Sequence, residues 1–240
     1  MLSLLSTALL GYESQPADRS LSPELDCAAM VTPVDVSPVR SPQAVHTLLA
    51  RRFAGKDLVE IGTRNGDGMA CFAQTARTAV AVEYDARYCE ILRDRAAEMA
   101  AQGAGNFSVH CADYRAGLPA ADVYTWWEQE PDLADAKILH NLRQMSNLRP
   151  GAQAVMLFDH SWYADMNSWR RLQPELRWFE RVDYNERAAC LARDRPWGDA
   201  SNAPKDGPIA WGYTCKRANG TFSVAGLDLV PASSNLAVES

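Results

Sequence analysis

The sequence predicts an α/β fold: a mostly parallel sheet with helices on both faces, followed by a C-terminal antiparallel hairpin. Three observations support this prediction. Short apolar runs alternate with helical patterns between residues 41 and 160, which is typical of right-handed β–α–β units. A glycine-rich turn follows the first of these runs and precedes a helical pattern. Two later strand patterns have no helix between them, which indicates a hairpin.

The chain has 240 residues, of which 47% are hydrophobic and 22% are charged, and this is ordinary for a globular protein. A chain of this length buries roughly 70–75% of its unfolded surface, enough for one domain with its own core. Prolines recur through residues 13–42, so we expect residues 1–40 to be a mostly irregular N-terminal arm. Residues 41–230 are the expected single domain, and residues 231–240 a tail.

The N-terminal arm begins with a short apolar run. This run is about half as long as the ~20 apolar residues that span a bilayer, and no basic residue precedes it as in a secretory signal. We interpret it as a short amphipathic helix or an ordered arm, with a targeting signal as the alternative. Its apolar residues are Leu2, Leu4, Leu5, Ala8, Leu9 and Leu10.

Charge and cysteine content bear on partners and compartment. The formal net charge is −6, whereas nucleic acids and anionic membranes attract basic surfaces, so neither is expected as a partner. The cysteines form no C-x-x-C pair, so neither disulfides nor a zinc site are expected, and Cys71, Cys89 and Cys111 fall in apolar or helical patterns where cysteine usually acts as a small hydrophobe. A reducing, cytoplasmic compartment is therefore expected. The cysteines are Cys27, Cys71, Cys89, Cys111, Cys190 and Cys215.

The first predicted helix begins near Ser41, because serine is a favoured N-cap and the proline after it suits the first helical position. Gly55 marks its end. Residues 57–62 are the next apolar run, which predicts a buried strand. The apolar positions that recur at helical spacing in the first helix are Val45, Leu48, Leu49 and Phe53.

The alternation continues with a helix over residues 67–75, a strand over 78–83 and a helix over 86–101. In the helix over 86–101 the apolar side chains form one stripe, with Arg95 as an exposed exception at its edge. The other elements of this alternating part are strands over residues 107–111, 122–126 and 153–158 and a helix over residues 132–147.

The hairpin is predicted from two strand patterns, Trp178–Tyr184 and Ile209–Arg217. A loop rich in proline, glycine and aspartate separates them. The second pattern has a period of two, as a half-buried strand requires. The side chains that alternate at this period are Ile209, Trp211, Tyr213 and Cys215.

The turn after the first predicted strand is the most informative segment for function. Gly62, Gly66 and Gly68 lie in it, and ligands of open α/β sheets bind at such turns, beside the carboxyl ends of the strands. Gly62 allows a tight turn, and the later glycines allow helix, strand and ligand to approach one another closely. Glu60 is unusual, because a charge inside an apolar strand needs backbone donors or a cation.

Two further acids follow the next two strands. Glu83 ends the second predicted strand, 21 residues after Gly62, and a carboxylate at this separation commonly accepts the ribose hydroxyls of a nucleoside. Asp113 follows the third predicted strand. Because parallel strands end at the same edge of a sheet, Glu60, Glu83 and Asp113 are expected to form a row there.

On these residues the chain resembles the cofactor half of class I S-adenosylmethionine-dependent methyltransferases over residues 41–160. Glu60, Gly62 and Gly66 match the E-x-G-x-x-x-G turn of the family's catechol O-methyltransferase-like branch. The resemblance implies a Rossmann-like methyltransferase fold with a seven-stranded sheet, and S-adenosyl-L-methionine as the cofactor. A sulfonium is a cation, and carboxylates and aromatic rings stabilise it.

The resemblance also implies individual roles. Glu83 matches the ribose-binding acid, and Asp113, with Tyr114 beside it, matches the acid near the adenine. The cofactor-binding residues that follow from the match are Glu60, Gly62, Thr63, Arg64, Gly66, Glu83, Tyr84, Asp113 and Tyr114.

Asp159 and His160 end the fifth predicted strand, near the place where the methyl acceptor lies in this fold. A histidine there can remove a proton from a hydroxyl or an amine, so the two residues are the candidate catalytic pair. The alternative is that His160 caps the next helix. No metal is expected, because tryptophan stands at Trp126 where the metal-dependent branch has an aspartate. The candidate acceptor-binding residues are Trp127, Trp162 and Tyr163.

The predicted activity is methyl transfer to an oxygen or nitrogen of a small-molecule acceptor, an aromatic one among the options. Three alternatives stay open. A nicotinamide-dependent short-chain dehydrogenase fits the glycine spacing but lacks its Tyr-x-x-x-Lys motif. An aminopropyltransferase fits the fold but needs an acid where Trp126 and Trp127 stand. A non-catalytic binding protein on the same fold is the third.

Overall fold

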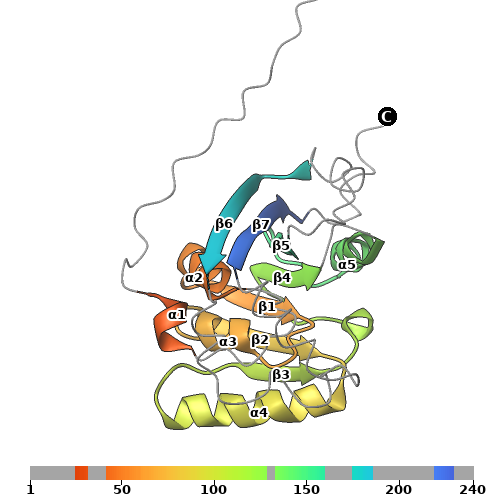
Figure 1. Ribbon diagram of the computed structural model, residues 1–240. Helices are drawn as coiled ribbons and strands as arrows, with labels where there is room; N and C mark the ends of the chain where they lie inside the picture. The colour runs from red at the N-terminus through yellow and green to blue at the C-terminus, as the bar shows by residue number, and fades with distance from the viewer. Residues whose placement is uncertain (1–24, 32–41, 129–132, 160–174, 186–218, 230–240) are drawn as a thin grey trace, which may run out of the picture.

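The computed structural model describes residues 25–31, 42–128, 133–159, 175–185 and 219–229. Seven strands form one sheet in the order β3-β2-β1-β4-β5-β7-β6 (Figure 1). Along the chain they are β1 (Asp57–Ile61), β2 (Thr78–Glu83), β3 (Ser108–Cys111), β4 (Val123–Glu128), β5 (Gln153–Asp159), β6 (Trp178–Asn185) and β7 (Asn219–Asp228).

The first five strands pair in parallel, as the alternating pattern predicts. β7 lies antiparallel between β5 and β6 and is the one strand of this sheet that runs in the opposite direction. All five residues of β1 are buried, because a central parallel strand is covered on both faces.

The described helices are α1 (Cys27–Met30), α2 (Gln43–Arg52), α3 (Asp67–Phe72), α4 (Ala86–Ala101), α5 (Leu133–Arg143) and the 3₁₀ turn η1 (Tyr114–Ala116). The bounds of α4 agree with the predicted helix. Pro42 is the N-cap of α2, whereas the sequence placed this proline inside the helix; Ser41 lies outside the described residues.

Two apolar layers enclose the sheet, and alternate residues of each strand enter one or the other. On one face, Leu58 and Val123 pack with side chains of α1 to α4. On the other face, Val59 and Tyr124 pack with side chains of α5. This period of two within continuous apolar strands confirms the expected helical cover on both faces.

The strand that pairs with β6 lies further along the chain than the segment predicted for it. β6 coincides with the predicted strand at Trp178–Tyr184, but its partner is β7, and residues 209–217 lie outside the described residues. β7 is an inner strand with six consecutive buried residues, so it lacks the polar–apolar alternation by which a half-buried strand is recognised.

The expectation that the cysteines form no disulfides is also wrong. Cys27 is bonded to Cys71, and Cys89 is bonded to Cys111, so the described part of the chain contains no free cysteine. The first bond ties α1, inside the predicted N-terminal arm, to α3. The helix or strand pattern around a cysteine does not show which other cysteine lies opposite it. Within the described ranges no helix is long and apolar enough to cross a membrane.

Candidate functional site

The carboxyl ends of β1, β2 and β3 lie side by side at one edge of the sheet. Ile61, the last residue of β1, lies opposite Val82, and Glu83, the last residue of β2, lies opposite Cys111, the last residue of β3. The glycine turn, Glu83 and the segment that contains Asp113 therefore share this edge. We call it the acidic edge.

The glycine turn after β1 depends on left-handed backbone conformations. Gly62 and Gly66 have φ of 73° and 79°, and Arg64 has φ of 53°. Gly62 N–H donates to the carbonyl of Val82 at 2.8 Å, which holds the turn against β2. A Cβ on Gly66 would come within 2.6 Å of Leu92 Cδ2, so this turn lies directly on α4.

Glu60 lies beneath the turn and is 8% exposed. A Cβ added to Gly68 would collide with its carboxylate, so the glycine is needed for the first residues of α3 to pass over this acid. Thr63 Oγ1 donates to the Glu60 carbonyl at 3.0 Å. The structure thus confirms that Gly68 allows the start of α3 to approach β1 closely.

Glu83 is buried, and its carboxylate connects β2 to the glycine turn. Arg64 N–H donates to Oε2 at 2.8 Å, and the N–H groups of Tyr84 and Asp85 donate to Oε1 at 2.8 and 3.0 Å. Three backbone donors thus compensate the buried charge and fix the orientation of the carboxylate.

Asp113 lies just beyond β3 and caps η1. Arg115 donates to its carboxylate from both the guanidinium and the backbone N–H, and these bonds lower the pKa of Asp113 to about 2. Tyr114 packs at the margin of the apolar layer below α5. Tyr84 is 77% exposed, an unusual state for a large aromatic side chain.

The prediction that Arg95 is an exposed exception on α4 is wrong. Its side chain is 15% exposed and donates to the carbonyl of Asn65 at 2.6 Å and to Asp67 Oδ1 at 2.7 Å. Arg95 therefore fixes the glycine turn to α4. A polar residue inside an apolar stripe is the sequence signal for such a buried contact, but the partner is 28 residues away along the chain.

His46 on α2 is buried near the ion pair between Arg95 and Asp67. Its Nδ1 lies 3.2 Å from Gln43 Oε1, and the charges of Asp67 and Arg95 act on the ring. Burial lowers the pKa of His46 to about 4, with a smaller opposing effect from Asp67. The folded protein therefore resists protonation of a group that the unfolded chain protonates near pH 6.5.

We expect the free energy of unfolding to fall by about 2 kcal/mol between pH 7.5 and 5, because only the unfolded state takes up a proton at His46 in this range. His46→Gln removes this titration, so its stability should vary less over the same range. His140→Gln, on an exposed position of α5, is the matched control. Urea unfolding at several pH values measures the effect; equal pH slopes for wild type and His46→Gln would contradict it.

The structure describes only some of the candidate catalytic and acceptor-binding residues. Trp127 is half-buried in β4 and packs against the layer that contains α2 and α3. Asp159 is the last residue of β5, opposite Phe222, so its backbone is at the same edge as Glu83. His160, Trp162 and Tyr163 lie outside the described residues.

Trp126 lies in the apolar layer that contains α5, on the face of the sheet opposite to that of Trp127. It is 1% exposed, and its Nε1 donates to Asp135 Oδ1 at 2.6 Å. Among the residues that the structure describes, no three His, Cys, Asp or Glu side chains are grouped so that they could hold a metal ion.

A pocket of about 500 Å³ lies between α1, α3 and α4. Asn65 and Arg95 are among its lining residues, so it lies behind the glycine turn.

No family model and no curated protein sequence match this chain. Solved structures match most of it. A dimethyladenosine transferase from Plasmodium falciparum is 16% identical with a TM-score of 0.49, covering 83% of this chain and 65% of that one. An RNA methyltransferase from Salinibacter ruber, in complex with S-adenosylhomocysteine, is 15% identical with a TM-score of 0.47, covering 79% and 93%. The N-methyltransferase NodS from Bradyrhizobium japonicum is 14% identical with a TM-score of 0.47, covering 78% and 94%.

The sheet itself identifies the fold. Its order β3-β2-β1-β4-β5-β7-β6, with β7 antiparallel to its neighbours, agrees with the seven-stranded sheet and terminal hairpin that the sequence resemblance implies. The glycine turn and the acids lie at the carboxyl ends of the strands, where ligands of such sheets bind. The chain thus has the Rossmann-like fold of the class I S-adenosylmethionine-dependent methyltransferases.

Proposed function

We propose that this protein is an S-adenosylmethionine-dependent methyltransferase that acts on an oxygen or nitrogen of a small acceptor. The observation that carries the proposal is the contact between Glu83 and the glycine turn. The Arg64 N–H that donates to Glu83 Oε2 joins a ligand-binding turn to a strand-end acid, at the edge of the sheet where a nucleoside would lie.

The donor set suits the ribose of the cofactor. A carboxylate oxygen has two lone pairs, and Glu83 Oε2 accepts one hydrogen bond while Oε1 accepts two. Oε2 can therefore accept one ribose hydroxyl without losing its bond to the turn. The exposed ring of Tyr84, the next residue, could then cover the adenine and become buried with it.

When bound, the cofactor supplies a methyl group on a positively charged sulfur. Glu60 and Glu83 place negative charge at the acidic edge, which favours a cationic ligand, whereas the charge of Asp113 is offset by its ion pair with Arg115. The glycine turn would hold that ligand beside the end of β1. Catalysis would then depend mainly on holding donor and acceptor in line, with modest help from a base.

On the acceptor side we propose Asp159 and His160 as the pair that receives the acceptor's proton. Trp127, Trp162 and Tyr163 would contact the acceptor. Asp159 supports this assignment, because it ends β5 at the acidic edge. The net charge of −6 favours a small molecule over RNA as the acceptor.

Calorimetric titration tests the cofactor. We expect S-adenosylmethionine and S-adenosylhomocysteine to bind and NADH not to bind. Binding of NADH alone would favour the dehydrogenase, and binding of none of the three would reject the proposal. Transfer of radioactive methyl groups to a panel of small phenols, amines and total RNA then tests the acceptor. Methylation of RNA alone would contradict the small-molecule acceptor, and tight binding of the cofactor without turnover of any acceptor would favour the non-catalytic alternative.

A further inference from the structure

The Cys89–Cys111 disulfide lies directly beside the acidic edge. Cys89 is in the first turn of α4 and is completely buried, and its Sγ lies 3.4 Å from the carbonyl oxygen of Glu83. Cys111 is the last residue of β3 and is opposite Glu83 in the strand register. The bond therefore connects α4, the helix after Glu83, to β3, the strand before Asp113.

β3 is held by its parallel pairing with β2 and by packing on α4, and the disulfide adds a covalent link to α4. It is an edge strand of four residues that pairs only with β2 in the described sheet, and none of its residues is fully buried. Asp113 follows two residues after Cys111, and its carboxylate bonds to Arg115 within the same short turn. The disulfide thus adds a covalent limit to the movement of the segment that carries Asp113 relative to Glu83.

We propose that thiol–disulfide exchange at Cys89–Cys111 regulates cofactor binding, with the oxidised form binding tightly and the reduced form weakly. The proposal rests on the proposed function, because the ligand is the same nucleoside. In the oxidised protein Glu83 and Asp113 are held at a fixed separation. In the reduced protein β3 and η1 lose their covalent link to α4 and can shift relative to Glu83, so binding must first restore the arrangement of the two acids.

The two half-cystines differ in access. Cys111 is exposed, whereas Cys89 is 0% exposed. A dithiol reductant would attack Cys111 Sγ with one thiolate, break the S–S bond and release Cys89 as a thiolate that takes up a proton. The second thiol of the reductant then attacks the mixed disulfide and releases Cys111 as a thiol. The reductant becomes a disulfide, and two electrons pass to the protein. A small disulfide such as oxidised glutathione reverses the reaction.

The Cys27–Cys71 disulfide provides an internal control. Both of its cysteines are 0% exposed, and it joins α1 to α3, where no cofactor contact is assigned. A dithiol should therefore leave this bond intact in the folded protein. Loss of this bond by mutation should lower stability without changing the redox response of the acidic edge.

The experiment measures the Kd of S-adenosylhomocysteine by calorimetry before and after treatment with dithiothreitol, with alkylation and mass spectrometry to establish which cysteines are reduced. Of the two described disulfides, we expect reduction of Cys89–Cys111 only, with at least tenfold weaker binding that oxidised glutathione reverses. The variant Cys89→Ser/Cys111→Ser should bind weakly with and without the reductant. The variant Cys27→Ser/Cys71→Ser should keep the full response.

Equal Kd values for the oxidised and reduced wild-type protein would overturn the proposal, and this comparison needs no variant to fold. Wild-type affinity in Cys89→Ser/Cys111→Ser would also overturn it. If neither redox form binds the nucleoside, the proposed function is wrong and the regulation fails with it; tight, redox-independent binding would reject the regulation alone.

Discussion

Replacing Glu83 with glutamine is expected to weaken the binding of S-adenosylhomocysteine at least 30-fold, which corresponds to about 2 kcal/mol. The variant keeps the length and shape of the side chain but loses its charge. A hydrogen bond from a ribose hydroxyl to a carboxylate is roughly twice as strong as one to a neutral amide.

The backbone around Glu83 makes this substitution more severe than loss of one ligand contact. Both carboxylate oxygens accept N–H groups, Oε2 from Arg64 and Oε1 from Tyr84 and Asp85. An amide must point its NH₂ group at one of these donors in either orientation. If it faces Arg64, the glycine turn loses the bond from Arg64 and keeps only the bond from Gly62 to β2, so the ligand-binding conformation of the turn becomes less populated.

Calorimetry gives the affinity, and thermal unfolding without ligand separates a lost ligand contact from a general loss of stability. Asp85→Asn is the matched control, since Asp85 is the next acid along the chain and caps α4 from an exposed position. We expect its Kd to stay within about twofold of wild type. Wild-type affinity in Glu83→Gln would show that the ribose does not bind at this carboxylate.

The sequence predicted the acidic edge well because the required signals are local. The apolar run, the glycine turn and the strand-end acid Glu83 each occupy a few consecutive residues, and parallel pairing brings the strand ends together. The same reasoning predicted the bounds of α4 from a long amphipathic pattern, and the structure adds that Asp85 caps its first turn.

The features that sequence reasoning missed depend on contacts between distant residues. Arg95 was assigned to the surface because its partners, Asn65 and Asp67, are about 30 residues away in sequence. The same holds for the pairing of Cys89 with Cys111. β7 was missed for a different reason, since an inner strand buried on both faces has no period of two.

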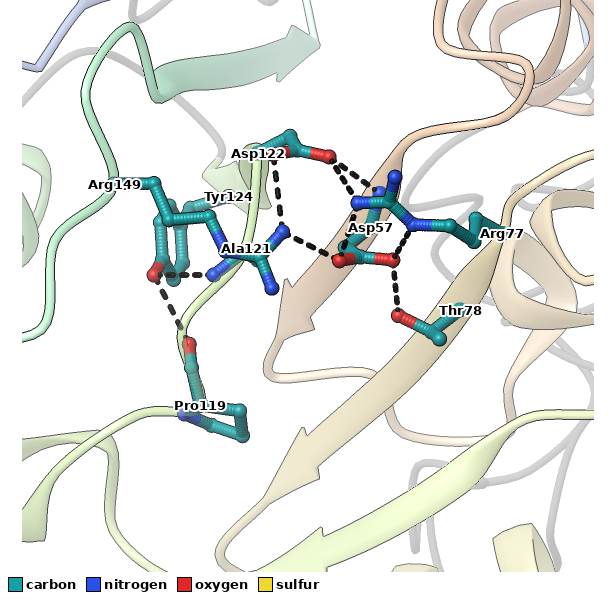
Figure 2. A network of polar contacts seen from close by, with 8 residues as sticks. All are labelled: Asp57, Arg77, Thr78, Pro119, Ala121, Asp122, Tyr124 and Arg149. Atoms are coloured by element: carbon teal, nitrogen blue, oxygen red, sulfur yellow. Dashed lines mark hydrogen bonds and ion pairs between the residues drawn. The ribbon is translucent and has the colours of Figure 1, made fainter.

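The edge of the sheet opposite the acidic edge is held by a polar network (Figure 2). Asp57 begins β1 and lies opposite Thr78, the first residue of β2. Its carboxylate accepts hydrogen bonds from Thr78 Oγ1 at 2.8 Å, from Arg77 Nε and an Arg77 terminal nitrogen at 2.8 and 2.7 Å, and from Arg149. Asp122, just before β4, bonds to both arginines as well.

Asp57→Asn is expected to lower the free energy of unfolding by about 2–3 kcal/mol without changing the affinity for S-adenosylhomocysteine. The Asp57 side chain is 9% exposed and both of its oxygens accept donors, so the amide NH₂ must face another donor in either orientation. The arginines are 58% and 35% exposed, which limits the loss, because water can solvate their charges.

Urea unfolding at pH 7 measures the loss, and Asp228→Asn provides the comparison. Asp228 also pairs with an arginine at a strand end, Arg177, but the two side chains are 38% and 68% exposed, so this variant should lose under about 0.5 kcal/mol. The arginine bonds lower the pKa of Asp57, so its contribution is present at pH values above the usual carboxyl pKa of 3.8 and is lost as the pH falls below it. Equal losses for the two variants at pH 7 would mean that Asp57 acts as an ordinary surface ion pair, and the strand ends would then be held by apolar packing alone.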